Sequence, residues 1–423
     1  MNKPLCIVSC PIDTYSGYGA RSRDFVEALV RVKPDWDVKV LPQRWGNTRW
    51  GYLKDHNKQA LIERQIHSID QQPQVWIQIT IPNEFQKIGK YNIGVTAGVE
   101  TTVCAYDWIL GVNKMDLVLA SSQFTKDTLT NSVYTTKEGQ SVRTTTPIEV
   151  LFEGLDTELY KKLKPSEVDF NLDQVQESSV FLVVGHWMKG VEGSDRKDIG
   201  TAVRTFLETF KNKANAPALL LKTQQASASL TDKATLIKKI NSIRHSIKAG
   251  SLPNVYVVHG DLTDQQINQL YNHPKVKALI SLTKGEGFGR PLLEFSSVGK
   301  PIIASGWSGL TDFLHPEKTT LLPGLLEPVH PSVVDDKIFL KNATWFKADT
   351  KVFSQKLKDI HKDPKSFNKQ ALSQRRYALD NFSMEKMDEL LGKLLLENLP
   401  EFPKLVELKL PQLELPNLKK IEN

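Results

Sequence analysis

The chain has 423 residues, 40% of them hydrophobic and 24% charged, which is ordinary for a globular protein with room for two domains. No apolar run reaches the length of a membrane span, and three cysteines are too few for a disulfide framework or a zinc site, so we expect buried, reduced thiols. The net charge of +7 lies mainly in residues 180–345, which suits an anionic ligand, and no dense basic run interleaved with aromatic residues indicates a nucleic-acid surface.

The first residues enter directly into an apolar segment without a cleavable signal pattern, so we expect a cytoplasmic protein. Leu5 to Val8 reads as a strand, Ala20 to Val30 has the apolar period of a helix, and Asp37 to Leu41 reads as the next strand. The segment between the first strand and the helix places Gly17 and Gly19 in a loop. These elements predict the opening of a doubly wound α/β domain, and the loop is either a ligand-contacting loop or a tight turn.

Two further strands are predicted at Val75 to Ile81 and Tyr91 to Thr96. Glu100 follows the second of them as the only acidic group there. It could hydrogen-bond hydroxyl groups or assist the deprotonation of one, and a helix-capping or surface role is an equally good interpretation. The Asp35 to Asp37 segment has the D-x-D spelling of some metal sites, but no second acidic cluster accompanies it, so metal use is not indicated.

The acidic, non-periodic stretch from Lys164 to Ser178 is the natural linker between two domains. A second domain opens with Val180 to Val184, a continuous apolar run that fits a central parallel strand. His186 follows this strand directly, and Arg196 and Lys197 precede the next predicted helix. A lysine at this place either binds an anion or is a solvated loop residue.

The most informative segment, Lys284 to Ser305, reads K-G-E-G-F-G-R-P-L-L-E-F-S-S-V-G-K-P-I-I-A-S. A buried strand precedes a glycine loop and a short helix, so free N–H groups and a helix N-terminus converge on a site suited to a phosphate. Glu286 and Glu294 flank this site, and carboxylates beside a diphosphate need hydrogen-bond donors such as sugar hydroxyls. The segment therefore predicts a nucleotide-sugar site; the alternative is a glycine turn before an ordinary helix.

The pattern E-G-F-G-x-P-x-x-E followed by G-x-P-I-I-A-S resembles the signature of retaining GT-B glycosyltransferases, above all glycosyltransferase family four. In that family the first Glu holds hydroxyls of the transferred sugar, the glycine-loop amides meet the sugar and the diphosphate, and the second Glu holds the nucleotide ribose. The resemblance assigns these roles to Glu286, to Gly287, Phe288 and Gly289, and to Glu294.

The resemblance also implies that the loop with Gly17 and Gly19 faces the donor phosphates, and that Lys197 matches a lysine that clamps the diphosphate. Two departures stand out. The family arginine that accompanies this lysine is replaced by His186, which makes Lys189 or Arg196 a candidate for the missing charge. Many relatives also carry a histidine where this chain offers Glu100 as the nearest group.

The fold implied by the resemblance is GT-B, with two Rossmann-like doubly wound domains facing a cleft and a C-terminal helix that crosses back to the first domain. The predicted domains are residues 1–165 with the crossing helix 383–396, and residues 166–382. Residues 323–350 fit the pattern poorly and are interpreted as an insertion. The proline-containing tail, residues 397–423, is either an extended arm or a partly disordered end.

We expect a retaining, metal-independent glycosyltransferase that uses no cofactor beyond its nucleotide-sugar co-substrate, with Glu286, Lys197 and Glu100 as the catalytic candidates. The acceptor is a hydroxyl group of a glycan, a lipid or a small molecule. A weaker resemblance to glycosyltransferases of large tailed bacteriophages adds a hydroxylated DNA base, and then the cytoplasm would be that of the host cell. The alternative is a non-catalytic nucleotide-sugar-binding protein, which the two departures favour; a GT-B epimerase or phosphorylase fits the signature less well.

Overall fold

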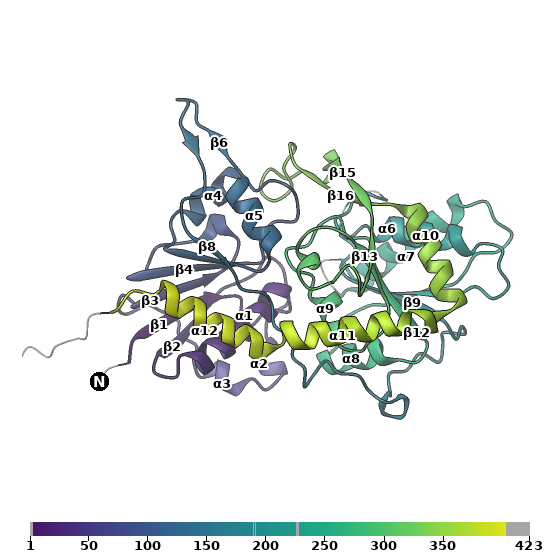
Figure 1. The fold of residues 1–423 in the computed structure, drawn as a ribbon, viewed down its shortest axis with the longest axis horizontal. Helices are drawn as coiled ribbons and strands as arrows, with labels where there is room; N and C mark the ends of the chain where they lie inside the picture. The colour runs from purple at the N-terminus through teal and green to yellow at the C-terminus, as the bar shows by residue number, and fades with distance from the viewer. Residues whose placement is uncertain (1–2, 189, 191, 226–227, 403–423) are drawn as a thin grey trace, which may run out of the picture.

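The computed structural model describes residues 3–188, 190, 192–225 and 228–402, and it contains two parallel six-stranded sheets that lie side by side (Figure 1). From position 403 onward, the tail predicted for residues 397–423 lies outside the described residues. Within the described part of the chain, no helix is long and apolar enough to cross a membrane.

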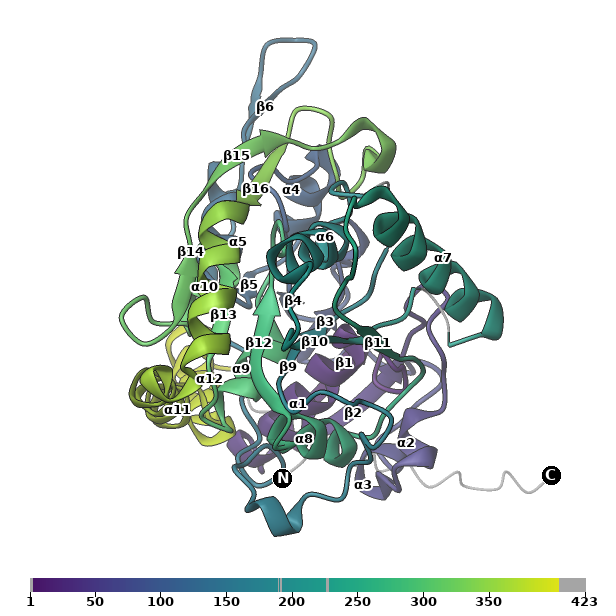
Figure 2. The same ribbon diagram turned by 90° about the vertical axis from the view of Figure 1, so that its right-hand side faces the viewer.

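The first sheet has the strand order β2-β1-β3-β4-β5-β8, and all of its neighbouring strands are parallel. Its central strands β3 and β4 are buried along almost their whole length, as expected where helices cover both faces of a sheet. A short antiparallel hairpin, β6–β7, projects beyond the body of the molecule (Figure 2). The elements of this half are β1 (Leu5–Cys10), α1 (Gly17–Val32), β2 (Asp37–Pro42), α2 (Tyr52–Asp55), α3 (Gln59–Ile62), β3 (Val75–Ile79), β4 (Tyr91–Thr96), α4 (Tyr106–Val112), β5 (Leu117–Ala120), α5 (Gln123–Asn131), β6 (Tyr134–Thr135), β7 (Ser141–Val142) and β8 (Ile148–Val150).

The second sheet has the order β11-β10-β9-β12-β13-β14, again with parallel neighbours. Its elements are β9 (Val180–Val184), α6 (Ile199–Phe210), β10 (Ala218–Lys222), α7 (Leu230–Ser246), β11 (Val255–Val258), α8 (Asp264–Asn272), β12 (Val276–Ser281), α9 (Arg290–Ser296), β13 (Ile302–Ser305) and β14 (Thr320–Leu322). The following elements are β15 (Gly324–Pro328), β16 (Thr344–Ala348), α10 (Thr350–Lys362), α11 (Asn368–Phe382) and α12 (Met384–Asn398).

The order of the second sheet creates a topological switch point between β9 and β12, because the chain winds outward from β9 in one direction and then from β12 in the other. In open α/β sheets, ligands bind outside the carboxyl ends of the strands at such a switch point. His186 and Lys197 lie on the first loop, and Glu286 lies on the second. The topology alone therefore brings these three residues to one edge of the sheet.

Residues 323–350, interpreted as an insertion, form a defined hairpin in which β15 and β16 pair antiparallel. The connection between the two strands packs on the first half of the molecule, since Leu340, Ala343 and Trp345 share one buried apolar cluster with Trp108 of α4. Thr102 N–H donates to Thr344 O at 2.9 Å, which ties the same hairpin to the segment after β4. The hairpin thus joins the two halves.

Two consecutive helices near the C-terminus run along both halves (Figure 1). α11 lies on the second half, and α12 packs against α1 on the first half. Ser383 caps α12 through its hydroxyl, as its position before the helix predicts. Met387 and Leu391 on the buried face of α12 belong to the apolar core around β1 and β3. The predicted crossing helix is therefore present, whereas the exact domain boundaries stay predictions.

The prediction that Gly17 and Gly19 lie in a loop is wrong, because α1 already begins at Gly17. Ser16 has an extended backbone and accepts a hydrogen bond from Gly19 N–H at 2.9 Å, so it starts the helix one turn earlier than the apolar pattern indicates.

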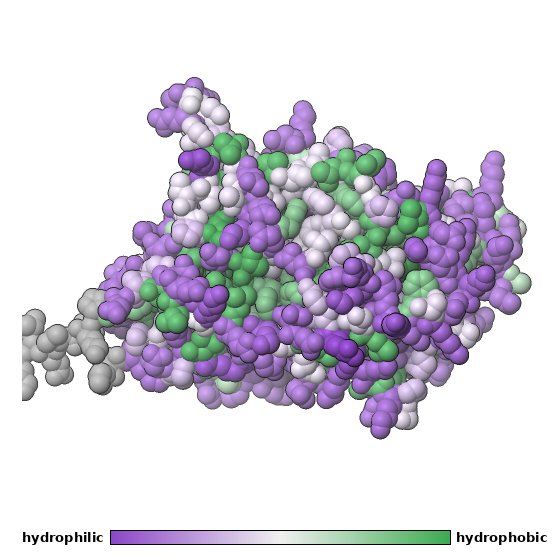
Figure 3. Space-filling view, viewed as in Figure 1, coloured by the Kyte–Doolittle hydropathy of each residue, from purple (hydrophilic) through white to green (hydrophobic). Residues whose placement is uncertain are grey.

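The three cysteines are buried and free, as expected. Hydrophilic residues cover most of the face in Figure 3, and one apolar patch coincides with β15, where Leu325 and Leu326 are exposed.

Candidate active site

The glycine loop from Lys284 to Gly289 connects β12 to α9 at the switch point of the second sheet. Gly289 has a φ of +108°, a left-handed conformation that side chains rarely adopt, and it precedes α9 directly. Pro291 occupies the first turn of α9, where its missing N–H costs nothing. This turn chemistry fixes the loop with Glu286 at its centre.

Glu286 is the carboxylate of this loop, and its side chain is only 9% exposed. Its Oε1 lies 2.5 Å from Lys197 Nζ, and its Oε2 lies 3.0 Å from Arg196 Nη1. Burial works against ionisation of Glu286, but Lys197 and Arg196 outweigh it and hold its pKa at about 2. Glu286 is therefore a carboxylate at neutral pH.

Arg196 also reaches Glu100, whose Oε2 lies 2.8 Å from Arg196 Nε. Burial raises the pKa of Glu100 even though Arg196 opposes the shift. Glu100 is thus neither a helix cap nor a solvated surface residue, because the ion pair brings it from the end of β4 into contact with the loop after β9. The four side chains of Glu100, Arg196, Lys197 and Glu286 form one network across the two halves.

His186 does not supply the positive charge that the resemblance requires at its position. Partial burial, together with the like charge of the neighbouring Lys197, lowers the pKa of His186 to about 4, so the ring is neutral at pH 7. Lys189, one of two candidates for the missing charge, lies outside the described residues. Arg196, the other candidate, is the cation that meets Glu286.

The glycines of the loop allow its backbone to touch the first half. A Cβ atom at Gly285 would lie 1.9 Å from Glu100 O, and one at Gly287 would lie 1.8 Å from Ala97 O. Phe288, which the resemblance places beside the donor, is only 2% exposed and packs against Phe313 with ring centroids 4.9 Å apart. Its ring is therefore part of the core, and only its backbone can face a ligand.

Glu294 lies on α9 with its Oε1 at 3.4 Å from Arg290 Nε. Burial raises the pKa of Glu294 to about 7, and the nearby Arg290 opposes the shift only in part. Arg290 is shared, because its Nη1 also lies 2.5 Å from Asp24 of α1 and 3.4 Å from Glu153. Glu294 is consequently close to half-protonated at neutral pH, in contrast to Glu286.

Gly17 and Gly19 stand at the start of α1 and differ from each other. A Cβ at Gly19 would lie 2.2 Å from Thr14 O, so the tight turn itself requires this glycine. A Cβ at Gly17 would meet nothing within 4 Å, which leaves open space for a ligand. Tyr18 between them places its hydroxyl 3.0 Å from Thr96 Oγ1 at the end of β4, and thereby connects this turn to the strand that leads to Glu100.

Three residues of this region are not identified by the sequence pattern. Ser308 has a φ of +71°, and its Oγ accepts the Glu286 N–H at 3.0 Å. Tyr18 stands between two glycines, and the sequence pattern gives it no role. Arg290 occupies a position of the signature at which any residue is allowed. A charged residue at the start of a short buried helix is the one signal that could have indicated Arg290.

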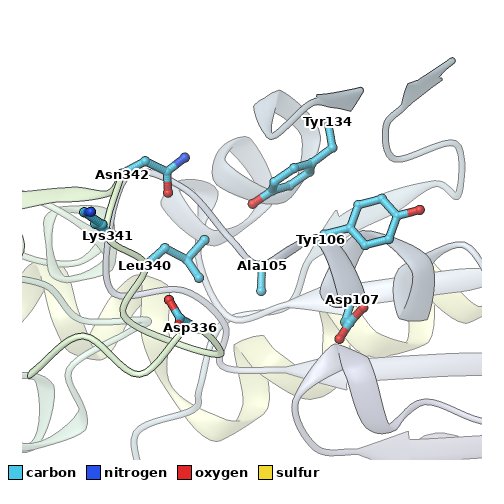
Figure 4. A pocket seen from close by; sticks show the side chains of 8 residues that line it. All are labelled: Ala105, Tyr106, Asp107, Tyr134, Asp336, Leu340, Lys341 and Asn342. Carbon is cyan, nitrogen blue, oxygen red and sulfur yellow. The ribbon is translucent and has the colours of Figure 1, made fainter. Parts of the chain in front are cut away.

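The space around the glycine loop is small. A cavity of about 10 Å³, roughly one water molecule, is lined by Lys197, Glu286 and Gly289 among others. A cavity of about 560 Å³ lies elsewhere, between α4, β6 and the segment before β16 (Figure 4). No group of three or more His, Cys, Asp or Glu residues with metal-binding geometry occurs among the described residues.

No protein-family model and no curated protein sequence matches the chain. Solved structures match along almost its whole length. HepE from Anabaena, solved with UDP and glucose, is 12% identical, covers 93% of this chain and 100% of its own, and has a TM-score of 0.61. Sucrose-phosphate synthase from Thermosynechococcus elongatus is 13% identical, with coverages of 94% and 99% and a TM-score of 0.61. A glycosyltransferase from Rickettsia africae is 14% identical, with coverages of 94% and 100% and a TM-score of 0.61.

This likeness establishes the fold. The two facing Rossmann-like sheets and the helix that crosses back form the GT-B arrangement of these glycosyltransferases, as predicted.

Proposed function

We propose that the protein is a retaining, metal-independent glycosyltransferase that moves a sugar from a nucleotide-diphosphate donor to a hydroxyl group. The observation that carries the proposal is the buried network in which Lys197 and Arg196 hold Glu286 at the switch point of the second sheet. The network offers cations for a diphosphate and a carboxylate for sugar hydroxyls within one hydrogen-bonded cluster.

Lys197 and Arg196 are the residues proposed to bind the diphosphate. Departing diphosphate gathers negative charge, and cations in a buried site stabilise this charge more strongly than they would in water. Burial lowers the pKa of Lys197, although Glu286 opposes the shift, so its ammonium gains from a second anionic partner. Arg196 takes the place of the arginine that the resemblance expects at His186.

Glu286 then orients the transferred sugar by accepting its hydroxyls, and Glu294 does the same for the ribose. The acceptor oxygen bonds to the anomeric carbon on the face that the phosphate leaves, the bond from that carbon to the phosphate oxygen breaks, and the phosphate takes the acceptor proton. Such a step needs no enzymic nucleophile. Glu100, held beside Glu286 by Arg196, is placed to position the acceptor hydroxyl.

Uridine diphosphate sugars are the first donors to test, because HepE was solved with UDP-glucose and a trehalose-phosphate synthase with this fold is UDP-forming. The acceptor classes are a glycan, a lipid, a small molecule or a hydroxylated DNA base. A DNA acceptor would show binding that weakens steeply as salt rises, since phosphate contacts release counterions.

The test is a thermal-shift screen with UDP-, GDP-, ADP- and dTDP-sugars, followed by a transfer assay. A donor at a hundred times its dissociation constant should add about 2.7 kcal/mol of stability to the wild type. Glu294→Ala should lose this shift, whereas Glu286→Gln should keep it and lose transfer. The conservative glutamine leaves Lys197 and Arg196 free for the diphosphate, so retained transfer by Glu286→Gln would overturn the proposal.

The second candidate is a protein that binds nucleotide sugars without transferring the sugar. The neutral His186 at the arginine position favours it. A donor-induced thermal shift without donor hydrolysis or transfer in the wild type would establish this candidate instead.

A further inference from the structure

The cavity of about 560 Å³ between the two halves has the size of a small-molecule site. One side is formed by the start of α4 and by β6, and the other by the segment that connects β15 to β16 (Figure 4). Leu340 is 9% exposed and Ala343 is 1% exposed, and both belong to the buried apolar cluster of α4. The walls are therefore held in place by core packing.

Aromatic rings and polar side chains face this cavity together. The rings of Tyr106 and Tyr134 stand edge to face with centroids 5.5 Å apart, and the Tyr134 hydroxyl donates to Cys104 O. The ring of Tyr106 lines the cavity, while its hydroxyl points outward (Figure 4). One aromatic wall is thus fixed by a hydrogen bond, and the other is held against it by ring packing.

Three polar side chains of the cavity have no partner among the residues that the structure describes. Asp107, Asp336 and Asn342 make no side-chain hydrogen bond or ion pair with any residue that the structure describes. Their oxygens and amide group are free to accept and donate hydrogen bonds to a ligand.

The charges of the cavity restrict the class of ligand. Two carboxylates, of Asp107 and Asp336, and one ammonium group, of Lys341, line it, so its formal net charge is negative (Figure 4). Such a lining repels phosphates, carboxylates and nucleic acid. Carboxylate and amide groups bind hydroxyls, and aromatic rings pack against the apolar faces of a sugar ring. We propose that the cavity binds a neutral saccharide.

The cavity is connected to the candidate active site on both sides. Ala105 in its wall is five residues from Glu100, so their Cα atoms lie at most about 18 Å apart. On the other side, Thr344 Oγ1 lies 3.0 Å from Thr102 Oγ1, and Phe346 N–H donates to Lys284 O at 2.9 Å. The hairpin that shapes the cavity therefore also contacts the glycine loop.

This connection assigns the cavity to the acceptor. A saccharide acceptor would place its reacting hydroxyl near Glu100 and a distal sugar unit between Tyr106 and Asn342. The assignment rests on the proposed function, since it presupposes a donor at Glu286. It narrows the acceptor to neutral glycans and excludes a DNA base.

The test is calorimetric titration of the full chain with methyl glucoside and maltotriose, and with glucose 6-phosphate and a DNA duplex as charged probes. Tyr106→Ala and Asp107→Asn should weaken saccharide binding about tenfold, the loss expected for one aromatic contact or one hydrogen bond to a charged group. Tyr106→Phe keeps the ring and should retain binding. Asp380→Asn, an exposed carboxylate of α11 outside the cavity, is the matched control.

The donor-induced thermal shift is measured on the same variants, and it should stay unchanged because none of them touches the glycine loop. If no neutral saccharide binds while the donor shift persists, the inference is wrong and the proposed function stands. Tighter binding of glucose 6-phosphate or of the duplex would also overturn it. Saccharide binding without any donor shift would refute the acceptor role.

Discussion

Glu286 and Glu294 lie on one short segment, yet their surroundings separate their pKa values. Glu286 faces two cations and has a pKa of about 2, whereas burial raises the pKa of Glu294 to about 7. Groups whose environments push their pKa values apart are typical of sites with distinct chemical roles. One carboxylate stays charged at every physiological pH, and the other changes its charge near neutrality.

Donor binding should therefore depend on pH through Glu294. Below pH 7 the free protein holds a proton on this carboxyl, and a ribose hydroxyl is accepted better by the charged form, so affinity should fall as the pH falls from 8 to 6. Calorimetry with a nucleotide sugar measures this, because its diphosphate does not titrate in that range. Glu294→Gln should bind with no such slope, and an identical slope in both proteins would refute the role.

The same shift predicts a stability effect of defined sign. The folded protein keeps the Glu294 proton up to about pH 7, whereas the unfolded chain releases it near the ordinary value of 4.5. The wild type should accordingly lose stability relative to Glu294→Gln as the pH rises from 4.5 through 7.

At the level of elements, Lys284 connects the glycine loop to the β15–β16 hairpin. Its side chain is 1% exposed, and its Nζ lies 2.7 Å from Glu327 Oε1 and 3.5 Å from Asp198 Oδ2. The ammonium also lies 5.5 Å from the centre of the Trp345 ring. One buried cation thus holds the start of the loop, the hairpin and the turn before α6 together.

Lys284→Ala should lower the free energy of unfolding by about 3–5 kcal/mol, because it leaves the buried Asp198 without its cation and leaves Glu327 with only the exposed Lys347. Lys347→Ala is the control, since Lys347 pairs with the same Glu327 at 3.1 Å but is 60% exposed. Its loss should stay below about 1 kcal/mol. Chemical denaturation of both variants gives the comparison, and equal losses would contradict the argument.

Elements of the sheets could be predicted where the sequence is locally sufficient. Tyr91 to Thr96 and Val180 to Val184 are strands with the predicted bounds. Val180 to Val184 is a continuous apolar run, which is typical of a central parallel strand in an α/β protein. The predicted start of α1 was wrong, because the Ser16 cap outweighs the low helix propensity of Gly17 and Gly19. The β15–β16 pair could not be predicted, because its partners lie sixteen or more residues apart and a different half of the molecule supports it.

The sequence indicated which residues belong to the site, but it did not indicate which of them contact one another. Glu286 and Lys197 were assigned through the family resemblance and Glu100 through its place after a strand, and the structure brings all three together. Arg196 was only one of two candidates, because an ion pair depends on how two distant loops meet at the switch point. The roles of all these residues stay predictions.

At the scale of the whole molecule, the last helix stabilises the first sheet. Leu391 of α12 is fully buried in the core around β1 and β3, and Arg31 of α1 holds Asp388 at 2.6 Å. The first half is therefore complete only after the chain has passed through the second half. Stability of the two halves is coupled through this return.

Leu391→Ala should destabilise the first half by about 2–5 kcal/mol, the cost of a cavity in a packed core. Hydrogen exchange should then accelerate in β1 and β3 more than in β9 and β12. Leu396→Ala on the same helix, where the side chain is 78% exposed, should change neither the stability nor the hydrogen exchange of the first half. Faster exchange confined to α12 would show that the helix is peripheral.

The network of Glu100, Arg196, Lys197 and Glu286 holds two positive and two negative charges, so it has no net charge when the site is empty. A free inorganic anion that bound Lys197 and Arg196 would leave Glu286 without hydrogen-bond donors. Phosphate or sulfate brings no hydroxyl groups that could replace these two cations. A nucleotide sugar supplies the anion and the hydroxyls together. The balanced charges would thus act as a filter against the abundant inorganic phosphates of a cell, with only a bifunctional ligand able to exchange both sets of partners at once.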